Sequence, residues 1–239
     1  MKEKFMVRRM IAKLKNKTGI DSKVVSYYSP GAAITEQYRN IRTYISSLNG
    51  GKLFRSLLIT SANRMEGKSI TCVNLAVIMA EEREKSTVLV SADFRNPKIE
   101  KLLNVRADKG LSNYLTEEIQ LDEILIKTSI ENLVILPAGD ILSNPAEFFT
   151  NQKMKSLITE LEMHFNYIIF DSPAIMPYSD ARILAPYVDG VLLAVQAGRT
   201  RREVVWRVEE QIKSVRAKLL GVILTNVEYY IPEYIHRYL

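Results

Sequence analysis

Short apolar runs alternate with longer amphipathic stretches along most of the chain. The runs predict six β-strands, at residues 56–60, 87–91, 133–136, 167–171, 190–195 and 221–225. Their apolar residues are nearly continuous, which is typical of strands covered on both faces of a parallel sheet. The stretches around them predict helices, at 34–48, 68–84, 97–104, 121–128, 152–164, 179–187 and 201–216. We therefore expect an α/β fold, with a doubly wound, mostly parallel sheet flanked by helices.

Positive charge is concentrated at the start of the chain. Residues 1–24 hold eight of the 33 Lys and Arg side chains and two of the 27 acidic ones, which accounts for the whole formal net charge of +6. We expect a basic N-terminal leader at 1–28, which is either an amphipathic helix that contacts anionic lipid or an acidic partner, or a solvated segment. Because the other residues balance in charge, nucleic acid is not an expected partner.

The number of cysteines and the hydropathy of the chain indicate where in the cell the protein is located. The single cysteine, Cys72, excludes a disulfide framework and a Cys-rich zinc site, and we expect it to be a small buried residue. No apolar run approaches the ~18 residues that a membrane-spanning helix needs. Together with the basic leader, these features favour a cytoplasmic protein that is peripheral at the inner face of the cell membrane.

A phosphate-binding motif follows the first predicted strand. Ala62, four further residues, Gly67, Lys68 and Ser69 match the A/G-x4-G-K-S/T form of the P-loop, between a strand and a helix. Backbone N–H groups of such a loop surround phosphate oxygens, the Lys reaches the β- and γ-phosphates, and the hydroxyl ligates Mg²⁺. We expect ATP and Mg²⁺ as cofactors. The residues predicted to bind the nucleotide are Ala62, Asn63, Arg64, Met65, Glu66, Gly67, Lys68, Ser69 and Ile70.

Two carboxylates follow or end predicted strands. Asp171 ends the strand 167–171, and Asp93 comes shortly after the strand 87–91. The carboxyl ends of parallel strands form the edge where such sheets bind ligands. We expect Lys68, Asp93 and Asp171 to be catalytic, and Asp93 and Asp171 to hold Mg²⁺ together with Ser69. The alternative for Asp171 is a turn or helix-capping residue before Ser-Pro.

Five stretches, collinear along the chain, resemble the cytoplasmic kinase domain of bacterial tyrosine kinases, the BY-kinases of capsule and exopolysaccharide synthesis. They are SPGAAITEQYRNIRTYI, SANRMEGKSITCVNLA, TVLVSADFRNPKIEKLL, LPAGDILSNPAEFF and FNYIIFDSPAIMPYSDARILAPYVDGVLLAVQAG. The fold is shared with the MinD- and ParA-like ATPases that place division sites and partition plasmids. Those carry an early P-loop Lys where this chain has Asn63. That difference favours the kinase over a MinD/ParA-like ATPase.

The resemblance implies a kinase-like domain at 29–227 and a tyrosine-rich tail at 228–239. It implies ATP-dependent autophosphorylation of tail tyrosines of a neighbouring subunit, here Tyr229, Tyr230, Tyr234 and Tyr238. The alternative is an apolar tail that packs on the domain or on a partner. The resemblance also implies a ring-like homo-oligomer, assembled through Glu36, Arg39 and Arg42 of an E-x2-R-x2-R helix, and a membrane activator, the polysaccharide co-polymerase. The alternative for these three residues is a solvated helix face.

One position departs from the family pattern. The family's second motif reads D-x-D-x-R after the strand, whereas this chain has Ser91-Ala92-Asp93-Phe94-Arg95. A Ser does not act unaided as a base at neutral pH, although phosphoryl transfer depends mostly on positioning and charge neutralisation. Two functions stay open: a tyrosine kinase that is weakened or slow, and a nucleotide-binding pseudokinase that acts as a scaffold in the same pathway.

Overall fold

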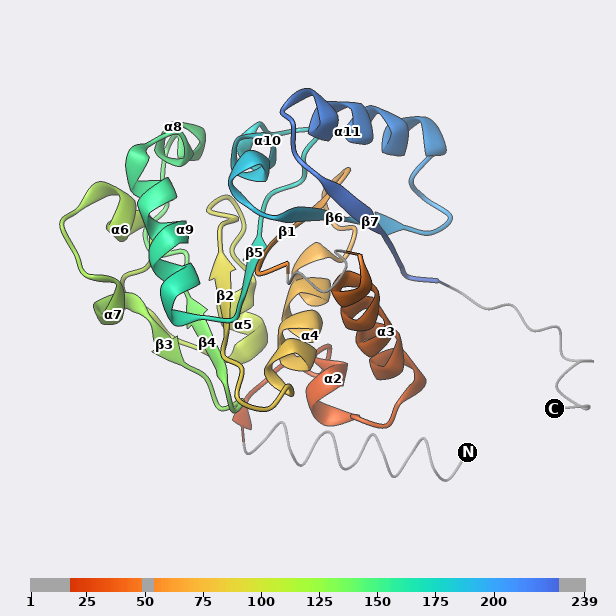
Figure 1. Ribbon diagram of the computed structural model, residues 1–239, viewed down its shortest axis with the longest axis horizontal. Coiled ribbons are helices and arrows are strands. Elements are labelled where there is room, and N and C mark those ends of the chain that lie inside the picture. The colour runs from red at the N-terminus through yellow and green to blue at the C-terminus, as the bar shows by residue number, and fades with distance from the viewer. Residues whose placement is uncertain (1–17, 49–53, 228–239) are drawn as a thin grey trace, which may run out of the picture.

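A seven-stranded sheet runs through the middle of the molecule, with helices on both faces (Figure 1). The computed structural model describes residues 18–48 and 54–227. The strands are β1 Ser56–Ser61, β2 Thr87–Ser91, β3 Ile126–Lys127, β4 Leu133–Leu136, β5 Tyr167–Asp171, β6 Gly190–Gln196 and β7 Leu219–Thr225. Their order is β3-β4-β2-β5-β1-β6-β7, and every neighbouring pair is parallel except β3 with β4. The predicted doubly wound, mostly parallel sheet is confirmed.

Two hydrophobic cores cover the two faces of this sheet. One lies under α2 Val25–Tyr28, α3 Ala33–Ser47, α4 Lys68–Ala80 and α5 Ile99–Leu103. The other lies under α6 Leu111–Thr116, α7 Leu121–Ile124, α8 Pro145–Phe149, α9 Gln152–His164, α10 Asp180–Leu184, the 3₁₀ helix η1 Ala185–Tyr187, and α11 Arg202–Ser214. Alternate residues of one strand enter opposite cores, as Leu57 and Leu58 of β1 do. This explains the continuous apolar runs.

The predicted helix 121–128 is wrong in its second half. Helix α7 ends at Ile124, and Ile126–Lys127 forms the edge strand β3, antiparallel to β4. The backbone is already extended at Leu125, and Ile126 packs against the core beneath the sheet. A two-residue edge strand is set by its tertiary partner, which overrides the local helical pattern.

Other differences are smaller. Helix α4 ends at Ala80 rather than at residue 84, and the turn that follows it contains Glu84 at a φ of 60°. Three short helices, α2, α6 and α8, were not predicted, because four to six residues give too little periodicity to recognise. No helix within the described ranges is both long and apolar enough to span a membrane.

Residues 18–28, which the sequence groups with the leader, pack on the body. Ile20, Val24 and Tyr28 are each 1% exposed. The buried Asn74 amide of α4 joins them to the P-loop helix, since its oxygen accepts from the Ser26 N–H at 2.9 Å and its nitrogen donates to the Lys23 carbonyl at 3.0 Å. The end of the predicted leader is therefore hydrogen-bonded to α4 and is part of the folded domain.

Candidate functional site: a phosphate-binding pocket

The loop between β1 and α4 has the geometry of a P-loop. β1 lies between β5 and β6, so the loop that follows its carboxyl end lies among inner strands of the sheet. Gly67 precedes the first turn of α4 with a φ of 83°, a left-handed conformation that favours glycine. A Cβ there would also lie 3.3 Å from Thr225. Lys68 and Ser69 then begin a 13-residue helix, and a helix N-terminus attracts phosphate.

A cavity of about 930 Å³ lies over this loop. Its wall comes from the P-loop, the segment after β2, the segment after β5, and the ends of β6 and β7. The predicted residues that line it are Arg64, Met65, Glu66, Gly67, Lys68, Ser69, Ile70 and Asp93. Ala62 and Asp171 lie beneath the lining, each 0% exposed, and Asn63 is exposed.

Three charged groups meet at the floor of this cavity. Lys68 Nζ lies 2.8 Å from Asp93 Oδ2, and both side chains are largely buried. Burial lowers the pKa of Lys68, but the charges of Asp171 and Asp93 outweigh burial, so the net shift is upward. The ammonium is therefore held charged where a phosphate would arrive.

Asp171 is fully buried and only partly satisfied. Burial raises its pKa to about 6, against the opposing effects of the Lys68 charge and the Ser69 hydroxyl. Its Oδ1 accepts from the Cys72 thiol at 3.6 Å, while its Oδ2 has no hydrogen-bond partner among the described residues. A buried carboxylate oxygen without a protein partner is costly, and this oxygen is free to ligate a metal ion.

The donor set fits Mg²⁺. Ser69, Asp93 and Asp171 offer hydroxyl and carboxylate oxygens, which are the ligands that Mg²⁺ prefers. No cluster of three or more His, Cys, Asp or Glu side chains suited to a metal occurs among the described residues. A Mg²⁺ ion completed by phosphate oxygens and water needs only one or two protein carboxylates, so the site agrees with a nucleotide-bound ion rather than a permanent one.

Ser91 lies beside Asp171 on the neighbouring strand. The two residues pair in the parallel register of β2 and β5, and the next N–H, of Ala92, donates to the Asp171 carbonyl at 2.9 Å. Ser91 is 0% exposed and its Oγ has no partner among the described residues. An Asp at this position would place a second carboxylate against Asp171, so Ser91 makes the floor less negative.

The side chain of Glu66, one of the predicted nucleotide-binding residues, holds the P-loop to other parts of the chain. Glu66 is 2% exposed, accepts from the Asn63 N–H at 3.0 Å, and also accepts from the Thr200 hydroxyl. Its backbone carbonyl accepts from the Thr225 hydroxyl at 2.8 Å. The loop is thereby tied to the segment before α11 and to β7. Thr200 and Thr225 lie more than 130 residues away, so the local motif gives no signal for them.

The sequence analysis missed a cluster in which Arg64 and Arg95 meet Tyr178 in the cavity wall and the buried Asp180 behind it. The Arg64 and Arg95 guanidinium carbons lie 5.0 Å and 4.2 Å from the centre of the Tyr178 ring. Arg95 Nη2 also lies 3.2 Å from Oδ2 of Asp180, which is 0% exposed. The sequence PYSDAR contains Tyr178 and Asp180, but only the fold brings them to the P-loop.

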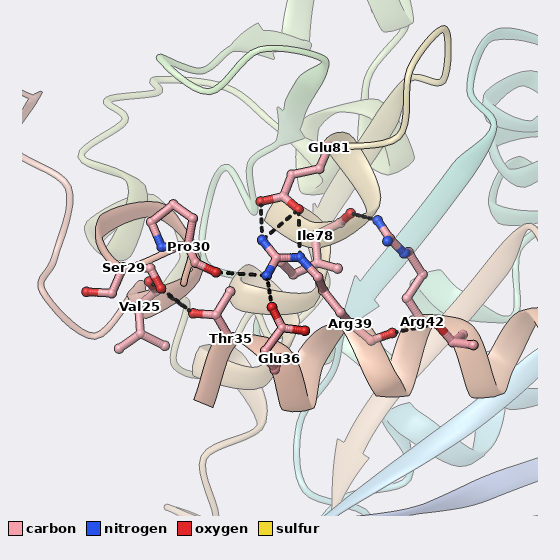
Figure 2. A network of polar contacts seen from close by, with 10 residues as sticks. Val25, Ser29, Pro30, Thr35, Glu36, Arg39, Arg42, Ile78 and Glu81 are labelled. Atoms are coloured by element: carbon pink, nitrogen blue, oxygen red, sulfur yellow. Dashed lines mark hydrogen bonds and ion pairs between the residues drawn. The ribbon is translucent and has the colours of Figure 1, made fainter. Parts of the chain in front are cut away.

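The predicted interface helix α3 is held to the far end of α4 (Figure 2). Arg39 pairs with Glu36 and, at 3.2 Å, with Glu81, which follows the last turn of α4. It also donates to the Pro30 carbonyl at 2.8 Å, and Arg42 donates to the Ile78 carbonyl at 2.8 Å. In this single chain all three motif residues therefore have partners inside the subunit. The predicted acceptor tyrosines lie outside the described residues.

Comparisons with known proteins agree with this geometry. An AAA domain family model matches residues 60–223. Tyrosine-protein kinase YwqD of Bacillus subtilis is 33% identical over 85% of both chains. Tyrosine-protein kinase CpsD of Streptococcus agalactiae is 37% identical over 84% of this chain and 87% of its own. The chain belongs to the bacterial tyrosine-kinase family.

The chain also matches part of a longer protein and several solved structures. The succinoglycan biosynthesis transport protein ExoP of Rhizobium meliloti is 30% identical over 84% of this chain, which corresponds to 26% of its own length. The crystal structure of the chimerical protein CapA2B2 superposes with a TM-score of 0.82 at 28% identity, over 91% of this chain and 99% of that one. The septum site-determining protein MinD of Pyrococcus horikoshii, solved with Mg-ADP, shares the fold at a TM-score of 0.62 and 22% identity, over 77% and 76%.

Proposed function

We propose that this BY-kinase family member is an ATP-dependent protein-tyrosine kinase that autophosphorylates C-terminal tyrosines and regulates capsule or exopolysaccharide synthesis and export. The observation that carries the proposal is the buried ion pair of Lys68 and Asp93 beside Asp171, on the floor of the P-loop cavity. The named activities of YwqD and CpsD support the kinase assignment, and the name of ExoP supports the pathway.

In this proposal the P-loop holds the phosphates of ATP. Backbone N–H groups at Gly67 and the first turn of α4 bind the phosphate oxygens, and Lys68 moves from Asp93 toward the transferred group. Ser69 and Asp171, with Asp93 once Lys68 has left it, hold Mg²⁺. When bound, Mg²⁺ neutralises charge on the phosphates and fixes their orientation. The unpartnered Oδ2 of Asp171 supports its place in this set.

Ser91 limits how well the site can take the proton from the hydroxyl of the acceptor tyrosine. Asp93 and Asp171 hold Mg²⁺ in this proposal, so neither replaces an Asp at position 91 as the general base for an incoming tyrosine. The lost general-base help lowers the rate by about 10²–10⁴-fold. Charge neutralisation by Lys68 remains, so we expect a slow kinase rather than an inert one.

Assembly and location belong to the same proposal. We assign Glu36, Arg39 and Arg42 to the contact between subunits of a ring. The Glu36–Arg39 and Arg39–Glu81 ion pairs lie on the surface, so their exchange for pairs with another subunit costs little. Arg42 would also give up a partly buried hydrogen bond to the Ile78 carbonyl. The basic leader would hold the cytoplasmic subunit at the inner face of the cell membrane, beside a polysaccharide co-polymerase that acts as activator.

A second function is favoured by one observation. Ser91 replaces the family Asp, and its buried hydroxyl has no hydrogen-bond partner in the part of the chain that the structure describes, so a charged group is replaced by one that forms no hydrogen bond there. A pseudokinase that binds nucleotide and acts as a scaffold would retain Lys68 and Asp171 but have no need of that Asp.

Mass spectrometry of the purified chain after incubation with Mg-ATP distinguishes the two. We expect phosphate on Tyr229, Tyr230, Tyr234 or Tyr238 in the wild type and none in Lys68→Ala, with the Ser91→Asp variant faster. If the wild type stays unmodified while Ser91→Asp becomes phosphorylated, the scaffold function replaces the kinase.

A further inference from the structure

The mouth of the nucleotide cavity carries more positive charge than the phosphate floor uses. Lys23, Arg64, Arg95, Lys98 and Lys101 line it in addition to Lys68. Three acidic residues also line the cavity: Asp93 is paired with Lys68, Glu66 is buried in hydrogen bonds, and Asp21 accepts from the Lys23 N–H at 2.9 Å. No ion pair between described residues involves Arg64, Lys98 or Lys101. The mouth is therefore suited to an anionic ligand.

Two of these cations have fixed positions. Arg64 and Arg95 both lie over the Tyr178 ring, at 5.0 Å and 4.2 Å from its centre. Arg95 is further held by the fully buried Asp180 carboxylate, with Nη2 at 3.2 Å and 3.5 Å from its two oxygens. An aromatic ring that binds a guanidinium in this way reduces its freedom without occupying its hydrogen-bond donors. Arg64 keeps all five donors available, because it has no hydrogen bond or ion pair to another described residue.

The tail sequence contains a matching feature. Two of its four tyrosines, Tyr229 and Tyr234, are each preceded directly by a glutamate, Glu228 and Glu233. A tyrosine that enters the cavity toward Lys68 brings its preceding side chain to the mouth. There a carboxylate meets the guanidinium groups, and such pairs are commonly bidentate.

We propose that Arg64 and Arg95, both held against the Tyr178 ring, select acceptor tyrosines that are preceded by an acidic residue. This inference rests on the proposed kinase function and adds the chemistry of its substrate: a Glu-Tyr step in the tail of another copy. Tyr178 acts as a positioning residue, and Asp180 keeps Arg95 in place. Tyr230 and Tyr238, which follow Tyr229 and Arg237, are then the poorer acceptors.

Peptide binding to the full chain tests the inference without requiring transfer. The probes are a fluorescent peptide of residues 226–239 and the same peptide with Glu228→Gln and Glu233→Gln, measured in the presence of Mg²⁺ and AMP-PNP. We expect the wild type to bind the Glu peptide about three- to tenfold more tightly, and Arg64→Gln to remove this preference. Arg207→Gln, an exposed arginine on α11 outside the cavity, is the matched control.

The positioning role of Tyr178 has its own readout. Tyr178→Leu should lower the preference for the Glu peptide about two- to fivefold, and Tyr178→Phe, which keeps the ring, should retain it. Equal binding of the two peptides by the wild type, or no binding of either, overturns the inference. So does an Arg64→Gln variant that loses affinity for AMP-PNP instead of peptide, since the guanidinium would then serve the nucleotide. Selective binding without any phosphate transfer would keep the inference and reject the kinase function.

Discussion

The two ends of helix α4 both hold arginine or lysine against carboxylates, but in different surroundings. At its N-terminus the side chains of Lys68 and Asp93 are only 11% and 5% exposed. At its C-terminus those of Arg39 and Glu81 are 24% and 35% exposed. Figure 2 shows this second pair. Charges that are paired away from water interact strongly, and the loss of one partner is costly, whereas exposed pairs are screened and exchange readily. The first arrangement suits a fixed phosphate site, and the second suits a contact that can be remade with another subunit.

The largest expected effect comes from removing the buried cation. Lys68→Ala should lower phosphate transfer by about 10²–10³-fold, because the positive charge that neutralises the transferred group is lost. Radiolabel incorporation from ATP measures it. The matched control is Lys98→Ala at the cavity mouth, which should change the rate far less. Equal losses in the two variants would contradict the claim that the buried charge of Lys68 contributes more to transfer than a charge at the cavity mouth.

The free energy of unfolding should depend on pH through the buried N-terminal end of α4 and not through its exposed C-terminal end. The pKa of Asp171 is raised to about 6 by burial, so the folded state binds its proton more tightly than the unfolded state. In metal-free buffer this group should therefore lower the free energy of unfolding as pH rises from about 4 to about 6, by about 2–3 kcal/mol in total. Urea titrations of the wild type and Asp171→Asn across this range measure the difference.

The control for this prediction lies at the other end of α4. Glu81→Gln, at an exposed pair, should follow the wild-type pH profile within a few tenths of a kcal/mol. If Asp171→Asn and the wild type have parallel profiles between pH 4 and pH 6, the carboxyl is not held neutral by burial.

A smaller effect is expected at Ser91. Its hydroxyl is buried and has no partner among the described residues, so Ser91→Ala should leave the free energy of unfolding unchanged or raise it by up to about 1 kcal/mol. Thermal unfolding checks this in the absence of nucleotide. A clear loss of stability would mean that the hydroxyl makes a hydrogen bond, for example through water.

The smallest effect belongs to the exposed network. Glu81→Ala should lower the free energy of unfolding by about 0.2–1 kcal/mol, and 1 M salt should reduce the difference further. Chemical denaturation at two salt concentrations measures it. A loss of several kcal/mol would show that this end of α4 is as rigidly held as the P-loop end, and the comparison would fail.

The sequence predicted what is set by local pattern. Strand–helix alternation gave the sheet, and the spacing from Ala62 to Ser69 gave the loop that lines the cavity. The sequence also predicted that Asp93 and Asp171 lie at the same edge of the sheet. Both residues are at the carboxyl ends of strands, and β2 and β5 are adjacent. Cys72 was correctly expected to be buried.

The rest depends on contacts between distant segments. Strand β3 is specified by its pairing with β4, and Glu66 by Thr200 and Thr225. The ion pair of Arg39 with Glu81 joins residues 42 positions apart, and the E-x2-R-x2-R spacing gives no sign of it. No local pattern states such pairings, so the sequence located the chemistry without showing which groups hold it in place.

Transfer between two marked copies of the chain tests the central claim most directly. One copy carries Phe in place of Tyr229, Tyr230, Tyr234 and Tyr238 and keeps its P-loop, while the other carries Lys68→Ala and keeps its tail. After mixing with Mg-ATP, we predict phosphate on the tail of the Lys68→Ala copy, detected by mass spectrometry, and none when that copy is incubated alone. An unmodified tail in the mixture, with ATP binding by the first copy intact, would contradict the account.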